Sequence, residues 1–145
     1  MHKCDEIMTK NPVCCLPADT VDKAAQVMKR ENIGSIPVIN NEKSRELVGI
    51  VTDRDLALKI VAEGKDAKST KVQEAMTRKV VTCRVDDDLQ KALDAMSKHQ
   101  LRRLPIVDSN NSVVGIIAQA DVATRINQPE KTAAMVKGIS QSDTT

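Results

Sequence analysis

The stretch Leu47-Val48-Gly49-Ile50-Val51-Thr52-Asp53-Arg54-Asp55-Leu56 occurs a second time as Val113-Val114-Gly115-Ile116-Ile117-Ala118-Gln119-Ala120-Asp121-Val122. In each copy a run of apolar residues is followed by polar residues and then by apolar residues at helical spacing. The copies therefore predict a strand that passes directly into a helix. The unbroken apolar runs also predict strands that are covered on both faces.

The rest of the chain follows the same duplication. A shift of 68 residues places Met8-Thr9 on Met76-Thr77, and a shift of 66 residues places Asp55 on Asp121. A unit of roughly 60 residues buries too little surface to be more than marginally stable alone, so we expect the two copies to pack together as one body. The expected division is a first repeat at 1–67, a second repeat at 68–127, and a short C-terminal helix with a frayed tail at 128–145.

Each repeat reads as a helix, two strands and a second helix, which is an α/β (α+β) unit with a small sheet packed against two helices. The expected elements of the first copy are a helix at 20–32, strands at 36–39 and 47–52, and a helix from 53 to about 64. Those of the second copy are a helix capped by one of the residues Asp86 to Asp88, strands at 104–107 and 113–118, and a helix at 119–126. Extended lead-in segments are expected at 11–16 and 79–85, with a polar linker at 65–74.

Composition narrows the class of protein. The 145 residues carry 22 Lys and Arg against 20 Asp and Glu, and they include no Phe, Tyr or Trp. The near-neutral net charge excludes a strongly basic nucleic-acid binder, and the stacking platform of single-strand binders is absent. We therefore expect no nucleic-acid partner, with a local basic patch as the alternative. The chain has no apolar run of about 20 residues and no apolar N-terminal leader, which predicts a cytoplasmic protein without a membrane partner.

Four cysteines, Cys4, Cys14, Cys15 and Cys83, are expected to be free thiols in a reducing compartment, with a disulfide or redox switch as the alternative. The cysteines and histidines match no zinc pattern, so no metal site is expected. The chain also shows no nucleophile and base at recognisable spacing and no Gly-rich phosphate loop. We therefore expect no catalytic residues and a protein that is not an enzyme.

Thr52 and Asp55 stand where the first-repeat strand becomes a helix. A helix start offers N–H groups and positive potential to a phosphate, and an Asp carboxylate can accept two hydroxyl hydrogens from a ribose. The pair therefore fits a nucleoside phosphate. The alternative is a capping box that stabilises the helix without any ligand. In the second copy Ala118 replaces Thr52 while Asp121 is retained, so we expect two unequal sites with the Thr52/Asp55 site the tighter one.

The duplicated motifs resemble a tandem pair of CBS domains, also called a Bateman module. The resemblance is carried by Ile7-Met8-Thr9, Ile33-Gly34-Ser35-Ile36-Pro37-Val38 and 47–56 in the first copy, and by Ala75-Met76-Thr77, 101–107 and 113–122 in the second. It covers about residues 4–127, and the whole chain is similar to stand-alone bacterial and archaeal CBS-pair proteins. It implies two pseudo-twofold-related repeats that bind an adenosine-containing ligand (AMP, ADP, ATP or S-adenosylmethionine) in clefts between them, with no obligatory cofactor.

The resemblance also implies roles for further residues. Arg102 and Arg103, and with them Arg54, would face ligand phosphates; the alternatives are solvated arginines or, for the Arg102-Arg103 pair, ion pairs with the Asp86 to Asp88 run. The adenine would lie against Val13, Cys15, Ile36 and Pro37, for which the alternative is simple core packing.

Three functions follow from these expectations. The first is a regulatory module that senses an adenosine ligand, forms a homodimer and signals to an unidentified effector protein. The second is a constitutive dimeric scaffold with vestigial sites, an idea that Ala118 supports. The third is a thiol-based stress sensor, motivated by the four cysteines.

Overall fold

The computed structural model describes residues 2–125 and separates into two compact units. The repeat-1 unit spans Val13–Val80, and the repeat-2 unit combines Met1–Pro12 with the chain from Val81 onward. Each unit consists of one repeat and the N-terminal segment of the other, residues 68–80 or 1–12, so the unit boundaries do not fall at the expected residues 67 and 68. We call these two segments, 1–12 and 68–80, the exchanged lead-ins. The expected mixture of small sheets and covering helices, an α+β fold, is confirmed.

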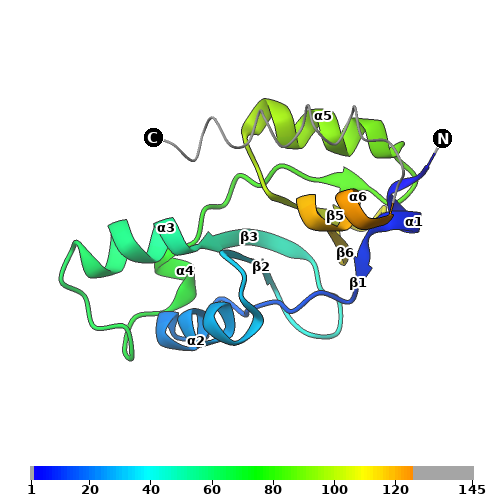
Figure 1. The fold of residues 1–145 in the computed structure, drawn as a ribbon. Helices are drawn as coiled ribbons and strands as arrows, with labels where there is room; N and C mark the ends of the chain where they lie inside the picture. Colours follow the sequence, from blue (N-terminus) through cyan, green and yellow to red (C-terminus); the bar gives the residue numbers. More distant parts are fainter. Residues whose placement is uncertain (1, 126–145) are drawn as a thin grey trace. The chain divides into compact units, whose positions relative to one another are not determined.

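The repeat-1 unit is built around the antiparallel hairpin of β2 (Ser35–Ile39) and β3 (Leu47–Thr52). The helices of the unit are α2 (Val21–Glu31), α3 (Asp53–Leu56), which continues into the π-helical turn η1 (Ala57–Val61), and α4 (Val72–Ala75). In Figure 1, α3 directly prolongs β3, so the strand-to-helix junction predicted at Thr52 is confirmed.

Helix α2 forms where the sequence predicts it. The hydroxyl of Thr20 accepts a hydrogen bond from the Lys23 amide at 3.2 Å, which caps the helix start. Asn32 ends the helix with φ 55°, a left-handed conformation that Asn tolerates well. The buried face consists of Val21, Ala24, Val27 and Met28, and it packs into the core of the repeat-1 unit.

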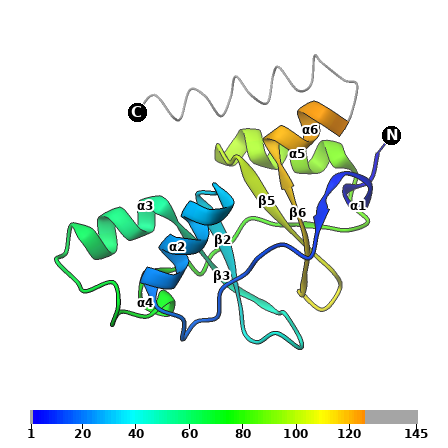
Figure 2. The ribbon, with the colours of Figure 1, turned by 60° about the horizontal axis from the view of Figure 1, so that its bottom comes forward.

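The repeat-2 unit has a four-stranded sheet in the order β1 (Thr9–Lys10), β6 (Val113–Ala118), β5 (Arg103–Val107) and β4 (Cys83–Arg84). Its helices are α1 (Cys4–Ile7), α5 (Leu89–His99) and α6 (Gln119–Arg125). β5 and β6 form an antiparallel hairpin (Figure 2), and β4 pairs with β5 in parallel, with Cys83 opposite Ile106.

The exchanged lead-in segments dock on the glycine of each Val-Gly-Ile strand. β1 pairs with β6, with Thr9 opposite Ile116, and Thr77 forms a β-bridge with Ile50. A Cβ atom on Gly49 would lie 2.7 Å from the Met76 sulfur, and one on Gly115 would lie 2.8 Å from Met8 Cγ. Glycine is therefore favoured at both strand positions, because the methionine of the other repeat's lead-in occupies the space of a side chain.

Some expectations about local structure are wrong. The segment 65–74 is not only a polar linker, because α4 begins within it and buries Val72 completely. α1 occupies a region with no expected helix. β3 alternates between buried and half-buried residues, so its two faces are not equally covered. The helix that starts at Asp53 ends at Val61, before the expected Gly64.

Helix α5 begins after Asp88, as expected, but that residue does not cap it through its side chain. The carboxylate of Asp88 instead accepts a hydrogen bond from Lys3 Nζ at 2.6 Å, so a contact with the exchanged lead-in replaces the local cap. The expected C-terminal helix and tail lie outside the described residues. Within 2–125, no helix combines the length and the apolar character needed to cross a bilayer.

Candidate functional site

The candidate site of the repeat-1 unit begins with a reciprocal pair of hydrogen bonds at the end of β3. The Thr52 hydroxyl accepts a hydrogen bond from the Asp55 amide at 3.0 Å, and the Thr52 amide donates to Asp55 Oδ2 at 3.0 Å. This is the capping box that the sequence offered as the structural alternative. It holds the carboxylate in a fixed orientation while leaving its second oxygen to other partners.

That second oxygen, Oδ1 of Asp55, meets two donors. Lys59 Nζ lies 3.0 Å away and the Thr77 hydroxyl lies 3.4 Å away. Lys59 also donates to the Ala75 carbonyl oxygen at 3.0 Å, at the C-terminal end of α4. We call Thr52, Asp55, Lys59 and Thr77 the Asp55 cluster. The carboxylate of Asp55, a residue that is only 9% exposed, connects α3, η1 and the lead-in of the second repeat.

The expectation that the start of α3 offers free N–H groups to a phosphate is wrong. The Asp53 amide donates to the Gly34 carbonyl at 2.9 Å, and the Arg54 amide donates to Asp53 Oδ1 at 2.8 Å. The Asp55 amide is the one bound by the Thr52 hydroxyl. Short polar side chains and a neighbouring backbone carbonyl thus satisfy the first turn, so a phosphate here would depend on cationic side chains.

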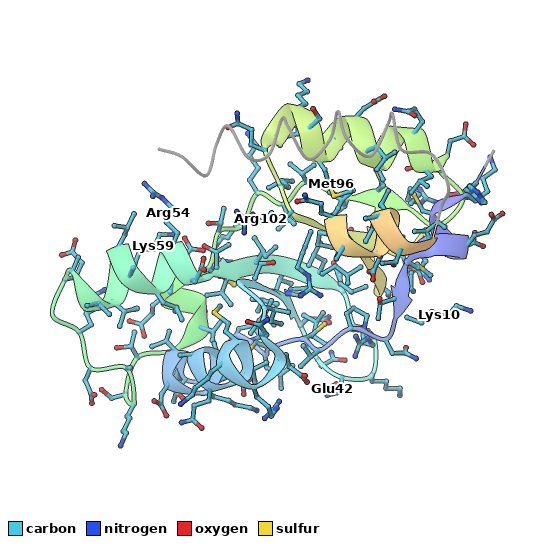
Figure 3. All side chains as sticks on the ribbon, in the orientation of Figure 1. Lys10, Glu42, Arg54, Lys59, Met96 and Arg102 are labelled. Atoms are coloured by element: carbon cyan, nitrogen blue, oxygen red, sulfur yellow. The ribbon has the colours of Figure 1, made fainter. Side chains whose placement is uncertain are left out.

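Two cations stand near this junction. Arg54 is exposed on α3 and Lys59 is exposed over 44% of its side chain (Figure 3). Both could neutralise a phosphate from a solvated position. The exposed position of Arg54 fits both predictions made from the sequence, a side chain that faces a ligand phosphate and an ordinary residue of the helix surface.

The repeat-2 unit has a matching arrangement around Asp121. We call Asp121, Thr9, Arg103 and Ala118 the Asp121 cluster. Thr9 donates its hydroxyl hydrogen to Asp121 Oδ2 at 3.2 Å, as Thr77 does to Asp55. Arg103 replaces the neutral Ser35 of the first hairpin and stands opposite Ala118 across β5 and β6. Relative to the first site, the second site therefore lacks the hydroxyls of Thr52 and Ser35 and has gained a guanidinium.

Arg103 is the more buried arginine of the expected pair. Burial lowers the pKa of Arg103, and the nearby carboxylate of Asp121 opposes part of that shift. Its Nε atom is buried and has no hydrogen-bond partner among the described residues. Arg102 is exposed, and the Asp86 to Asp88 run forms ion pairs with Lys3 and Lys91.

The residues expected to line the adenine lie together in the core of the repeat-1 unit. Cys15 is 1% exposed, Ile36 is 0% exposed, and Pro37 is buried, while Val13 is half-buried beside them. Cys15 also accepts and donates backbone hydrogen bonds, from Ile39 at 2.9 Å and to Pro37 at 3.0 Å. Packing accounts for these side chains in the structure, and Val13 retains the most free surface of the set.

Three of the four cysteines lie in the cores of the two units, and the fourth, Cys14, is half-buried. Cys4 and Cys83 are buried in the repeat-2 unit, and Cys15 is buried in the repeat-1 unit. Burial raises the pKa of Cys4 from 9.0 to about 12 and that of Cys15 to about 11, so both are protonated at neutral pH. Among the described residues no group of three or more His, Cys, Asp and Glu side chains could hold a metal ion.

Sequence reasoning missed Lys59 and Thr77. A lysine four residues after an aspartate is typical of an ordinary ion pair on a helix surface, so the spacing of Asp55 and Lys59 does not by itself indicate a site. The usable signal for Thr77 is its match with Thr9, because both repeats carry a Met-Thr pair in this N-terminal segment.

Comparison with known proteins agrees with this architecture. The CBS domain model matches the chain twice, at 4–62 and 72–128, so the chain belongs to the CBS domain family as a tandem pair. The CBS domain-containing protein YhcV of Bacillus subtilis is 37% identical over 143 residues, which are 99% of this chain and 99% of that protein.

Two similar solved structures carry adenosine compounds. The CBS domain pair of protein MJ0100, in complex with 5-methylthioadenosine and S-adenosyl-L-methionine, is 29% identical with a TM-score of 0.72 and covers 85% of this chain and 94% of its own. CBSX2 in complex with AMP is 25% identical with a TM-score of 0.72 and covers 94% of this chain and 99% of its own.

Proposed function

We propose that the protein is a regulatory module that binds an adenosine-containing ligand at the Asp55 cluster, without catalysing a reaction on it. The observation that carries the proposal is the oriented, nearly buried carboxylate of Asp55 at the junction of β3 and α3. A carboxylate accepts hydrogen bonds and donates none, so it suits the two hydroxyl groups of a ribose. The AMP bound by CBSX2 and the adenosine compounds bound by the MJ0100 pair support this ligand class.

The chemistry of the cluster divides the ligand between its groups. Asp55 would accept the ribose hydroxyls, while Arg54 and Lys59 are the cations available to a phosphate. The proposed signal is a change in homodimer or effector contacts on binding, which requires that the ligand bind one conformation more tightly than the other.

The test is calorimetric titration with AMP, ADP, ATP and S-adenosylmethionine, because a chain without aromatic residues has no useful intrinsic fluorescence. Asp55→Asn keeps the side-chain size and the capping geometry but removes the charge. Hydrogen bonds to charged groups contribute about 1.5–3 kcal/mol each, so loss of the charge should weaken binding roughly 10- to 100-fold. Asp53→Asn is the matched control, because Asp53 is exposed and the described hydrogen bond of its carboxylate is to the neighbouring Arg54 amide, which an Asn side chain can also accept.

Binding that Asp55→Asn weakens and Asp53→Asn leaves within about twofold would support the proposal. Absence of heat and of any melting shift at millimolar ligand would refute it and favour a constitutive scaffold. Light scattering with and without AMP tests the dimer and its response to ligand in the same samples.

A further inference from the structure

The Asp55 carboxylate is already nearly saturated before a ligand arrives. A carboxylate offers about four lone-pair positions. Three are taken, by the Thr52 amide at 3.0 Å on Oδ2 and by Lys59 and Thr77 on Oδ1 at 3.0 and 3.4 Å. One position therefore remains, whereas a ribose with its 2′ and 3′ hydroxyls donates two hydrogen bonds.

One of the three partners must therefore leave when a diol binds, and the three are not equal. The Thr52 amide is fixed by the backbone and belongs to the capping box. Lys59 is charged and is held at a second point by the Ala75 carbonyl. Thr77 makes the longest of the three contacts, and its hydroxyl is uncharged. Because Thr77 is exposed, water can replace Asp55 as the partner of that hydroxyl.

We propose that a ligand with a vicinal ribose diol displaces the Thr77 hydroxyl from Asp55, and that Thr77 thereby reports occupancy of the site to the segment joining the repeats. This inference rests on the proposed function. It makes Thr77 a positioning residue that distinguishes ribose from 2′-deoxyribose, because a ligand with one hydroxyl fits the free position without displacing it.

The consequence follows from where Thr77 lies. Its amide and carbonyl both bond Ile50 of β3 at 2.8 Å, and these two bonds dock the lead-in on the hairpin. Residue 77 lies between α4 and Val81, at which the chain enters the repeat-2 unit. Loss of the side-chain contact leaves this backbone bridge with less support, so ligand binding loosens the docked segment.

The experiment is a residue-resolved NMR titration of the full chain with AMP and with 2′-deoxy-AMP, in wild type, Thr77→Val and Thr77→Ser. Thr77→Val removes the competing hydroxyl, and Thr77→Ser is the matched control that restores it. The amide signals of Ile50 and Thr77 report on the Asp55 cluster alone, which separates it from the Asp121 cluster.

The hydrogen bond from the Thr77 hydroxyl to the Asp55 carboxylate is long, at 3.4 Å, so we assign to its loss roughly the fivefold change in an equilibrium constant of a weak hydrogen bond, not the larger change of a short charge-assisted one. Thr77→Val should therefore tighten AMP binding about fivefold and leave 2′-deoxy-AMP binding within about twofold. Thr77→Ser keeps the hydroxyl and should leave the affinity for both nucleotides within about twofold of wild type. In wild type, the Ile50 and Thr77 amides should exchange about fivefold faster in the AMP complex than in the 2′-deoxy-AMP complex.

The outcomes separate this inference from the function on which it rests. AMP binding with an unchanged ratio between AMP and 2′-deoxy-AMP in Thr77→Val overturns the role of Thr77 and leaves the proposed function standing. An equal or slower amide exchange in the AMP complex overturns the transmitted signal. Failure of both nucleotides to shift the signals of wild type overturns the proposed function and, with it, this inference.

Discussion

Gly115→Ala should destabilise the protein through a single side-chain clash. The added Cβ would lie 2.8 Å from Met8 Cγ and 3.1 Å from Met8 Cβ, and Met8 is only 8% exposed. Overpacking of this kind costs about 1–3 kcal/mol, and replacing a strand glycine by alanine returns roughly 0.5–1 kcal/mol of chain entropy. The net loss is about 1–2 kcal/mol, which corresponds to a lower Tm by roughly 2–8 °C in a chain of this size.

The assay is urea unfolding followed by far-UV circular dichroism, arranged as a double-mutant cycle with Met8→Ala. Met8→Ala alone should cost about 2–5 kcal/mol, because it empties a packed site. It also removes the atoms that crowd the new Cβ most closely, so Gly115→Ala should cost about 1 kcal/mol less in that background. An equal cost of Gly115→Ala in both backgrounds would refute the packing argument.

The equivalent glycine of the other unit gives a contrasting control. A Cβ on Gly49 would meet the Met76 sulfur at 2.7 Å and also the Thr77 carbonyl oxygen at 3.0 Å. That oxygen accepts a hydrogen bond from the Ile50 amide and cannot withdraw as a side chain can. Met76→Ala should therefore rescue Gly49→Ala less completely than Met8→Ala rescues Gly115→Ala, and an equal rescue would contradict the difference between the sites.

Two further predictions concern the helix cap and the thiols. Thr20→Ala should lower the free energy of unfolding by about 1 kcal/mol, because it removes the cap of α2. Asp88→Ala should lower it by less, because the Asp88 side chain binds an exposed lysine and does not cap α5. The urea midpoints of the two variants test this difference. Iodoacetamide at pH 8 should modify Cys4 at least about 100-fold more slowly in the folded chain than in urea, as followed by peptide mass spectrometry, because burial raises its pKa to about 12. Since the folded state keeps a proton that the unfolded chain releases near 9.0, the stability due to Cys4 is complete below that pH and is lost as the pH rises toward about 12. Wild type should accordingly lose stability more steeply than Cys4→Ala between pH 8 and 10.5, and parallel curves would contradict this assignment.

The sequence by itself predicts the duplication, the helix that starts after Thr20, both hairpins and the turn from β3 into α3. These features depend on residues close together in the chain, such as a capping threonine or an apolar run ended by a polar pair. The capping box of Thr52 and Asp55 belongs to the same class, since its two hydrogen bonds span three residues. Local patterns contain the information for such contacts, so a single sequence is enough to expect them.

Only the tertiary structure decides the exchange of the lead-in segments and the full set of partners of the site carboxylates. Thr77 meets Asp55 across 22 residues, and Thr9 meets Asp121 across 112. Met8 and Met76 fill the space left by glycines of the other repeat for the same reason. Helical and strand periodicities describe which face of an element is buried, but they do not say which distant segment covers it; that choice depends on side-chain volumes that meet after the chain has folded.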